Sequence, residues 1–401
     1  MDLKNIIDKY AHIWVVWNII NRIIKRYQKK DILNINLDLT SKTQKRILIC
    51  YVSTYGVDIA NTYHALYSHL NQIIKCLIDQ DFIIDLCDCL DLTAPQRFIF
   101  KEYDVILGQG PAYIDICKNH PRARKILFCT ENNPVVVEKK YKERAEYFAK
   151  RHPDLVKFIK KRRIIFFTEE HLKISDELIL MNSKYNEASF KDYFDNPYRI
   201  NVNAVVNPAF DISKLNDDIG SIKKNFLVFG CTGFIHKGID ILLDAFKEMP
   251  DINLLIFGIN EGEKLLFSKL KSENTYDCGF VNVASEDFLT KVVSQSLFVI
   301  LPSCSEGMSS GIATCMSHGL IPIITKDCGF DDNDDIIELP DYSVESIRKT
   351  IKRIIKIGDK ELKEKRLRLI DYSNSQFSIN LFSNSFKSIF NEIVESNNNK
   401  D

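Results

Sequence analysis

The chain has 401 residues, more than twice the length of a typical domain, which favours two domains with separate cores. Hydrophobic residues make up 45% of the chain and charged residues 27%, a balance that argues against disorder. The 54 lysines and arginines equal the 54 aspartates and glutamates, so no overall basic field favours binding to nucleic acid.

The cysteine pattern and the hydropathy of the chain bear on its location. The 11 cysteines form no CxxC pair and lie mostly in apolar runs, so we expect reduced core residues in a cytoplasmic protein. We expect neither a secretory signal nor a membrane span, because no stretch has the features of the first or the roughly 18 apolar residues of the second.

Residues 1–44 are predicted as an N-terminal amphipathic helical extension. Apolar side chains recur there at alternating spacings of four and three, as on one helix face: Ile6, Tyr10, Ile13, Trp17, Ile20, Ile24 and Tyr27. Basic residues gather in its C-terminal part: Arg22, Lys25, Arg26, Lys29 and Lys30. Two interpretations stay open. Residues 6–30 either lie on an anionic membrane surface, as in a peripheral protein of the inner face, or pack on this protein or a second subunit.

From residue 45 onward, short apolar runs alternate with helical segments in two series, the pattern of parallel α/β sheets. Strands are predicted at 47–52, 82–87, 103–107, 125–129, 164–167 and 200–208, and then at 226–230, 253–257, 297–301 and 320–324. We predict two Rossmann-like domains, 45–208 and 209–375, with parallel sheets facing across a cleft. A C-terminal helix over 376–401 would return towards the first domain. Ligands of such sheets bind beyond the carboxyl ends of the strands.

The first strand of the second series leads into a candidate phosphate-binding loop. After that strand come Cys231, Thr232, Gly233, Phe234, Ile235, His236, Lys237 and Gly238, and then a helical pattern. Glycines let the backbone approach a ligand, and loop amides together with the Lys237 ammonium can face an anion. We interpret the loop as a diphosphate cradle. An ordinary strand-to-helix turn is the alternative.

A second candidate segment follows the strand at 297–301. It runs through Pro302, Ser303, Cys304, Ser305, Glu306, Gly307, Met308, Ser309, Ser310 and Gly311 into a helix. The carboxylate of Glu306 can hold sugar hydroxyls, while the amides after Gly307 and the helix N-terminus can hold phosphate or hydroxyl oxygens. The alternative is a tight turn with a capping glutamate.

Together the two segments resemble the donor half of the retaining GT-B glycosyltransferases, the glycosyl transferases group 1, which include many lipopolysaccharide and capsule enzymes. The motifs that carry the resemblance are His236-Lys237-Gly238, Phe257-Gly258, Cys278-Gly279-Phe280-Val281, Pro302 to Gly307, and Met316-Ser317-His318-Gly319 with Pro322. The resemblance covers about residues 226–331 well and the first half in outline. It implies an α/β protein of the GT-B fold.

The resemblance also implies roles for individual residues. Lys237 would neutralise the donor diphosphate as the sugar bond breaks, and Glu306 would contact the transferred sugar. Gly233 and the backbone of Gly307, Met308, Ser309, Ser310 and Gly311 would complete the donor site. The nucleotide sugar is a co-substrate, so no cofactor is expected. The leaving phosphate would help to deprotonate the acceptor on the same face, so no protein nucleophile is required.

The chain departs from the family pattern at two positions. The second glutamate, eight positions after the first and implied to grip the ribose, is replaced by Thr314. The arginine that often accompanies the lysine is missing from the loop between Gly230 and Lys237. We expect altered donor binding rather than its loss. An inactive member is the alternative.

The first half offers acceptor-side candidates. Tyr55 and Gly56 lie in the loop after the first strand, where such enzymes place an element over donor phosphate and acceptor. Glu131 and Asn133 follow the strand at 125–129, and Glu131 could orient or deprotonate an acceptor hydroxyl. A strand-end turn stabilised by asparagines is an equal alternative.

We therefore expect a retaining glycosyltransferase that moves a sugar from a nucleotide sugar to a glycan or lipid-linked acceptor in cell-surface polysaccharide synthesis. The alternatives are a catalytically silent nucleotide- or glycan-binding protein and a GT-B-type nucleotide-sugar epimerase. The acidic run at 331–335 lacks the spacing of a calcium loop, so we expect an ordinary loop and no required metal.

Overall fold

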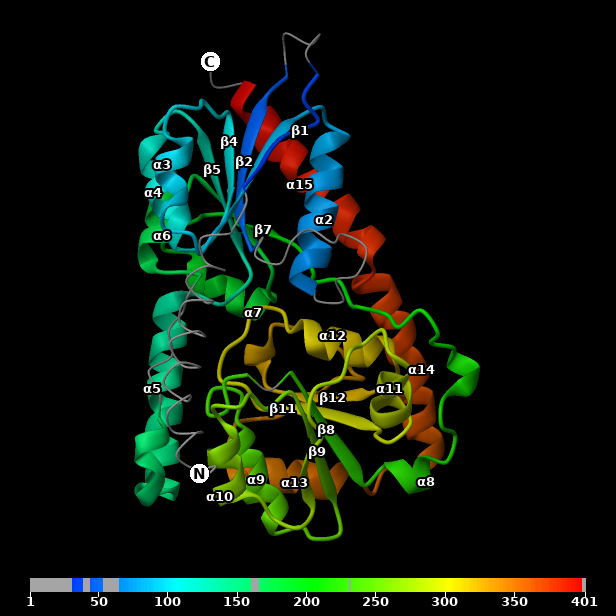
Figure 1. Ribbon diagram of the computed structural model, residues 1–401. Coiled ribbons are helices and arrows are strands. Elements are labelled where there is room, and N and C mark those ends of the chain that lie inside the picture. Colours follow the sequence, from blue (N-terminus) through cyan, green and yellow to red (C-terminus); the bar gives the residue numbers. More distant parts are fainter. Residues whose placement is uncertain (1–30, 39–43, 53–64, 160–165, 231, 399–401) are drawn as a thin grey trace, which may run out of the picture.

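The computed structural model describes residues 31–38, 44–52, 65–159, 166–230 and 232–398 as two α/β halves, each built on one sheet. The first sheet occupies the upper part of the molecule in Figure 1 and the second sheet the lower part. The predicted α/β architecture with two mainly parallel sheets is confirmed. The N-terminal helix predicted over residues 6–30 lies outside the described residues, as does the loop with Tyr55 and Gly56.

The first sheet has the spatial order β1-β3-β2-β4-β5-β6-β7. Its strands are β1 (Ile32–Ile35), β2 (Arg46–Tyr51), β3 (Ile83–Asp88), β4 (Val105–Gly108), β5 (Arg124–Cys129), β6 (Glu177–Leu180) and β7 (Tyr198–Arg199). All neighbours are parallel except β1, which runs antiparallel to β3. The parallel strands therefore end at one common edge, and the strand order reverses between β2 and β4.

The second sheet is wholly parallel, in the order β10-β9-β8-β11-β12-β13. Its strands are β8 (Asn225–Phe229), β9 (Asn253–Phe257), β10 (Thr275–Asp277), β11 (Phe298–Leu301), β12 (Ile321–Ile324) and β13 (Ile337–Glu338). The order reverses between β8 and β11. Open α/β sheets bind ligands at such a reversal, and both candidate segments begin there.

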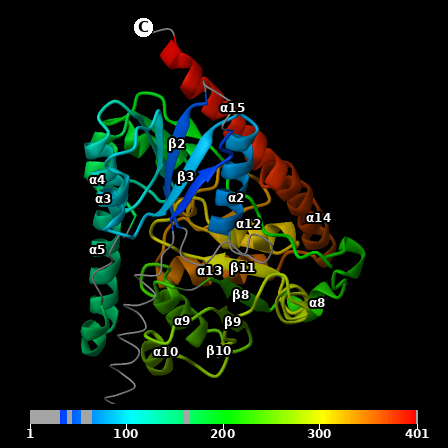
Figure 2. The ribbon, with the colours of Figure 1, turned by 45° about the horizontal axis from the view of Figure 1, so that its top comes forward.

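Helices cover both faces of each sheet (Figures 1 and 2). The first half contains α2 (Ala65–Ile78), α3 (Ala94–Phe98), α4 (Pro111–Asn119), α5 (Pro134–Arg151), η1 (Pro153–Phe158), α6 (Glu169–Ile174), α7 (Lys184–Glu187) and η2 (Ala188–Phe190). Then follow η3 (Ile212–Lys214), α8 (Ile219–Ile222), α9 (Ile239–Lys247), α10 (Lys264–Leu270), α11 (Glu286–Phe288), η4 (Leu289–Val293), α12 (Ser310–Ser317), η5 (Lys326–Cys328), α13 (Val344–Ile354), α14 (Asp359–Gln376) and α15 (Ile379–Asn398). In the part of the chain that the structure describes, no helix is long and apolar enough to cross a bilayer.

The two faces of the first sheet belong to two different cores, because side chains alternate along each strand. Ile47 and Ile49 of β2 belong to the core that contains Phe386 of α15, whereas Leu48 and Cys50 belong to the core under α3 and α4. The aromatic ring of Phe386 lies 6.5 Å from that of Phe128 in β5. Helix α15 therefore covers a face of the sheet that the beginning of the chain builds.

The segment over residues 200–208 was expected to be a strand, and this expectation is wrong. The ladder with β6 ends in the two-residue strand β7, and the chain then crosses to the second half without a partner strand. Several of its amides bond to second-half side chains instead. The Val205 N–H donates to Thr314 Oγ1 at 3.1 Å, and the Asn207 N–H donates to His318 Nε2 at 3.0 Å. The linker is thus fastened along α12.

The predicted strand at 164–167 is wrong in its described part. Phe166 and Phe167 belong to no strand, and the place in the sheet is taken by β6, which sequence reasoning missed. Phe167 is buried beside His171 of α6, with ring centroids 6.2 Å apart. An apolar run can thus be buried by helix packing alone, which periodicity does not distinguish from a strand.

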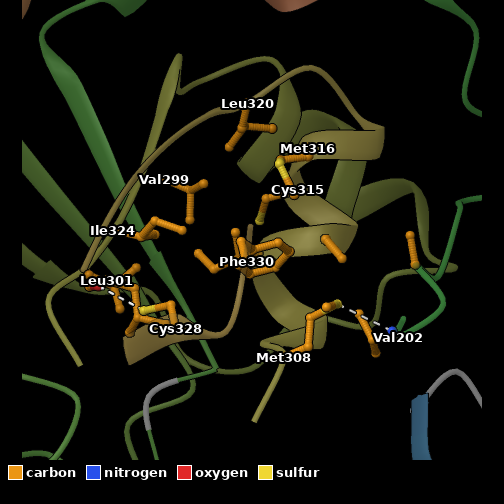
Figure 3. Packing of buried hydrophobic residues seen from close by; sticks show 14 of the residues in the cluster. Val202, Val299, Leu301, Met308, Cys315, Met316, Leu320, Ile324, Cys328 and Phe330 are labelled. Atoms are coloured by element: carbon orange, nitrogen blue, oxygen red, sulfur yellow. Dashed lines mark hydrogen bonds between the residues drawn. The ribbon is translucent and has the colours of Figure 1, made fainter. Parts of the chain in front are cut away.

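Figure 3 shows the core beneath the second candidate segment. Phe330 lies at the centre of this view, with Met316, Leu320 and Val299 around it. Met308 lies at its edge, where its sulfur accepts the Val202 N–H at 3.4 Å. The side chain of Met308 is therefore packed against the segment that carries Val202.

Candidate functional site

A cavity of about 680 Å³ lies between the carboxyl ends of the two sheets, a volume suited to a small-molecule ligand. The sequence-predicted residues that line it are Glu131, Lys237, Glu306, Gly307, Met308, Ser309, Ser310, Gly311 and Thr314. Glu131 comes from the first half and the others from the second. The structure therefore brings both walls of the predicted cleft together, while Gly233 and Asn133 lie outside the lining.

Lys237 stands in the loop between β8 and α9. Gly230 takes a φ of 76° where the strand ends, and Gly238 takes a φ of 75° where α9 begins, both in the left-handed region that glycine enters without strain. Between them the Lys237 N–H donates to Gly233 O at 2.8 Å and closes a turn. The lysine side chain is left 16% exposed and lines the cavity.

The loop amides predicted as a diphosphate cradle are already engaged. Glu263 Oε1 accepts the N–H groups of Gly233 at 3.2 Å and of Phe234 at 2.8 Å, while Asn260 donates to its other oxygen at 2.6 Å. A carboxylate thus occupies these two donors. Anion binding by this loop would therefore not use these two amides, and Lys237 would supply the charge.

Lys237 contacts Glu306 directly. Its Nζ donates to Glu306 Oε1 at 2.9 Å, and Ser303 Oγ donates to the same oxygen at 2.8 Å. His236 Nε2 lies 3.7 Å from that atom. A cation and an anion are therefore held in contact on one wall of the cavity. A bound diphosphate would compete for the ammonium, and sugar hydroxyls would compete for the carboxylate.

The backbone after Glu306 is tied to neighbouring segments. The Met308 N–H donates to Met181 O of the first half at 2.9 Å, and the Ser309 N–H donates to Cys328 O at 3.1 Å. These two amides, expected to hold donor oxygens, are therefore committed to protein carbonyls. Ser310 and Gly311 open α12, where N–H groups have no acceptor within the helix, so their amides keep the predicted role.

Thr314 lies on α12 and is 3% exposed, yet it reaches the cavity. Its Oγ1 accepts the Val205 N–H of the linker at 3.1 Å. One hydroxyl proton remains for donation, whereas a glutamate would have offered two acceptor oxygens. The site therefore has a different polarity here from the family pattern.

The two candidates after β5 have different positions. Glu131 is half-buried and lines the cavity. Asn133 is 3% exposed and caps α5: its Oδ1 accepts the Val135 N–H at 3.0 Å, and its Nδ2 donates to Ser189 O at 2.6 Å. The structural alternative therefore fits Asn133, and the acceptor-side role is left to Glu131.

Sequence reasoning assigned no role in the site to Ser303, His69 or Phe280, although Ser303 and Phe280 stand in the motifs that it singled out. Ser303 lies three residues before Glu306, a spacing that could have suggested the contact. His69 lines the first-half wall and stacks on Phe382 of α15 at 4.8 Å, a contact between distant parts of the chain that no local pattern shows. Phe280 is 87% exposed at the cavity, and exposure of a large aromatic residue can be seen only in the fold.

The acidic run at 331–335 forms ion pairs within the protein. Asp331 pairs with Arg199 at 2.9 Å, and Asp335 pairs with Lys365 at 2.9 Å and with Arg368 at 2.7 Å. No group of three or more potential metal-ligating side chains occurs among the residues that the structure describes. The run is thus a structural loop.

The site and the fold can now be compared with known proteins. Residues 214–376 match the family model described as "Glycosyl transferases group 1". This part of the chain is similar to that family. The matched segment runs from the end of η3 to the end of α14 and includes Lys237, Glu306 and Thr314. No curated protein matches the chain significantly in sequence.

Solved structures show the same fold at low identity. The sucrose-phosphate synthase from Thermosynechococcus elongatus has a TM-score of 0.60 and 12% identity, covering 88% of this chain and 100% of that one. WaaG, described as a glycosyltransferase involved in lipopolysaccharide biosynthesis, has a TM-score of 0.54 and 12% identity, covering 86% and 99%. TarM has a TM-score of 0.52 and 13% identity, covering 79% of this chain, which spans only 60% of the TarM chain. The GT-B fold is thereby confirmed.

Proposed function

We propose that this chain transfers a sugar from a nucleotide-diphosphate donor to a glycan or lipid-linked acceptor. The observation that carries the proposal is the cavity between the two sheets, where Lys237 Nζ contacts Glu306 Oε1 at 2.9 Å beside the start of α12. The family match supports the class of reaction. A structure of S. aureus TarM in complex with UDP supports a nucleotide-sugar donor.

The donor would bind to the second-half wall. The diphosphate would draw Lys237 away from Glu306 and accept hydrogen bonds from the Ser310 and Gly311 amides at the positive end of α12. Glu306, relieved of one partner, would accept hydroxyls of the sugar. Lys237 would then stabilise the negative charge that develops on the diphosphate as the bond to the sugar breaks.

The acceptor would approach from the first-half wall. Glu131 lines that side of the cavity and would orient or deprotonate the attacking hydroxyl. We propose retention, with the leaving phosphate taking the proton on the face where the new bond forms, and no required metal, since the Lys237 ammonium supplies the counter-charge. An acceptor on the inner face of a membrane would fit a role in cell-surface polysaccharide synthesis.

A catalytically silent binding protein is the second candidate. Two observations favour it: Thr314 offers a neutral hydroxyl that already accepts the Val205 N–H, and Glu263 already occupies the amides of Gly233 and Phe234. Such a site could bind a nucleotide weakly and release nothing. Catalytic turnover of a nucleotide sugar therefore distinguishes the transferase from the silent binding protein.

The test incubates the full chain with UDP-, GDP- and other nucleotide sugars and measures nucleotide release with and without lipid-linked acceptors. Acceptor-dependent release with one donor supports the transferase. Binding without release for every donor and acceptor supports the silent binder. A glycoside product with inverted configuration at the anomeric carbon contradicts retention.

Replacement of the lysine tests its assigned role. Lys237→Ala should lower kcat/KM at least about a hundredfold, because removal of one charge-stabilising donor costs about that much in enzymes that work this way. Lys269→Ala, on the exposed face of α10, is the matched control and should keep full activity. Full activity of Lys237→Ala would contradict the assignment.

A further inference from the structure

Arg144 of α5 is a cation from the first half buried against the second half. Its side chain is fully buried, and its Nη2 donates to Pro302 O at 2.6 Å. The guanidinium lies 4.2 Å from the ring centre of Tyr342, close enough for a cation–π contact. Burial lowers the pKa of Arg144, and the nearby carboxylate of Asp240 opposes this shift. A buried arginine costs folding free energy, so its position calls for a role.

The same guanidinium lies beside the segment that carries Lys237. A Cβ placed on Gly238 would lie 2.9 Å from Arg144 Nη1 and 2.7 Å from Pro302 O. Glycine at this position therefore makes room for the arginine. Arg144 thus contacts both segments of the donor site. In the first segment it lies against Gly238, the residue after Lys237, and in the second it bonds to Pro302, the residue before Ser303. The hydroxyl of Ser303 in turn donates to Glu306.

Lys140, one helical turn earlier on α5, contacts the other side of the Glu306 segment. It pairs with the carboxylate of Asp327, and the Asp327 carbonyl accepts the Glu306 N–H at 2.8 Å. Burial raises the pKa of Asp327, and the Lys140 ammonium opposes this rise. Two cations of one helix therefore contact the surroundings of Glu306: Arg144 bonds to the carbonyl of Pro302, and Lys140 pairs with the side chain of Asp327, whose carbonyl accepts the Glu306 N–H.

Helix α5 is anchored at both ends. Its first turn is capped by Asn133, next to Glu131 on the cavity wall, and near its last turn Arg151 pairs with Asp240 and Asp244 of α9. Figures 1 and 2 show α5 running from the first half alongside the second. The helix is thus a rigid connection between the acceptor-side wall and the donor-side loops.

We propose that α5 positions the donor site from the opposite half, with Arg144 as the main positioning residue for the Lys237–Glu306 pair. Arg144 touches no substrate in this scheme. It fixes the backbone at Pro302 and Gly238, so that the ammonium and the carboxylate keep their separation when the donor enters. This inference rests on the proposed transfer reaction, in which small displacements of such groups cost rate.

The experiment compares full-length Arg144→Met, Arg144→Lys and Lys140→Met with Lys142→Met, an exposed residue of the same helix, as the control. Two readouts are used: hydrogen exchange of the amides over residues 303–309, and kcat and KM for the donor. Arg144→Met should speed exchange there about tenfold and lower kcat about tenfold, with KM changed less than about threefold. Arg144→Lys should restore part of the slow exchange and part of kcat. Lys140→Met should also speed exchange and lower kcat, but by smaller factors than Arg144→Met.

The outcomes separate this inference from the proposed function. If the unaltered protein turns over no donor, the transfer reaction fails, and exchange over 303–309 still decides the positioning role. Unchanged exchange and kcat in Arg144→Met would overturn the inference. Exchange that rises equally throughout β8 to β12, with no recovery in Arg144→Lys, would also overturn it, because Arg144 would then only stabilise the fold. Lys140→Met decides the matter if Arg144→Met does not fold.

Discussion

Thr314 illustrates how one side chain serves both the fold and the site. Its hydroxyl oxygen accepts the Val205 N–H of the linker, and the same residue reaches the cavity from α12. A glutamate at this position would have to place a charged group where the linker now donates a backbone hydrogen bond. The departure from the family pattern is therefore coupled to the path of the linker.

Replacement of Thr314 by valine keeps the shape of the side chain and removes the acceptor. Thr314→Val should lower the free energy of unfolding by about 1–3 kcal/mol, because the Val205 N–H loses its partner in a part-buried position. Urea unfolding measures this change. Thr314→Ser keeps the acceptor oxygen and should therefore avoid most of this loss of stability. Equal stability of the valine variant and the unaltered protein would contradict the account.

Sequence reasoning was effective for some site residues and not for others. Lys237 and Glu306 stand in short motifs whose spacing predicts a shared place at two neighbouring strand ends, and the structure brings them to 2.9 Å. Arg144 contacts Pro302 across 158 positions of sequence. Such a contact depends on how the halves pack, which local spacing cannot show.

At the scale of elements, α12 connects the cavity to the linker through His318. This residue follows the helix, is fully buried, and accepts the Asn207 N–H on Nε2 at 3.0 Å. Its Nδ1 therefore carries the proton and donates to Thr314 O at 2.7 Å. Burial lowers the pKa of His318 to about 4, so the folded protein holds this ring neutral.

The lowered pKa of His318 predicts a pH-dependent stability. The unfolded chain binds a proton near its ordinary pKa of about 6.5, while the folded chain binds it only near pH 4, so acidification favours unfolding. Above about pH 6.5 both states hold His318 neutral, and this residue causes no pH-dependent loss of stability. As the pH falls towards 4, the free energy of unfolding decreases by roughly 3 kcal/mol on account of His318. His318→Asn should lack this part of the slope. Urea unfolding of both proteins between pH 7 and about pH 4.5 measures the difference; parallel curves would contradict it.

Sequence periodicity predicted the regular elements well where a strand is central in its sheet and apolar. The predicted strand at 125–129 matches β5 to within one residue. The segment at 200–208 also looks like a strand, yet its amides bond to side chains of α12, an alternative that sequence patterns do not reveal. Short edge strands such as β13, with two residues, carry too little pattern to be recognised.

At the scale of the whole molecule, the two halves touch at Gly307. A Cβ on this residue would lie 2.2 Å from Thr130 O and 3.2 Å from Glu131 N on the opposite wall. The Met308 N–H donates across the same boundary to Met181 O at 2.9 Å. The absence of a side chain at Gly307 is therefore what lets the halves approach this closely.

Gly307→Ala tests this contact. The added methyl group should push the halves apart at a cost of about 1–3 kcal/mol, break the Met308–Met181 bond and lower activity by about a hundredfold. Faster hydrogen exchange at the Met308 amide reports the separation. Gly358→Ala, which has nothing within 4 Å of the added carbon, is the control and should leave exchange and activity unchanged. Unaltered exchange and activity in Gly307→Ala would show that the contact is not required.

The packing of α15 bears on the order in which parts of this protein can fold during synthesis. Residues 379–398 cover part of the face of the first sheet that presents Ile47 and Ile49, so a ribosome must add more than three hundred further residues before α15 can pack there. An N-terminal domain ordinarily folds while the rest of the chain is being made. Here the nascent first half can bury this face only in part, against α2, until α15 has been made, and its final packing therefore follows the synthesis of the second half.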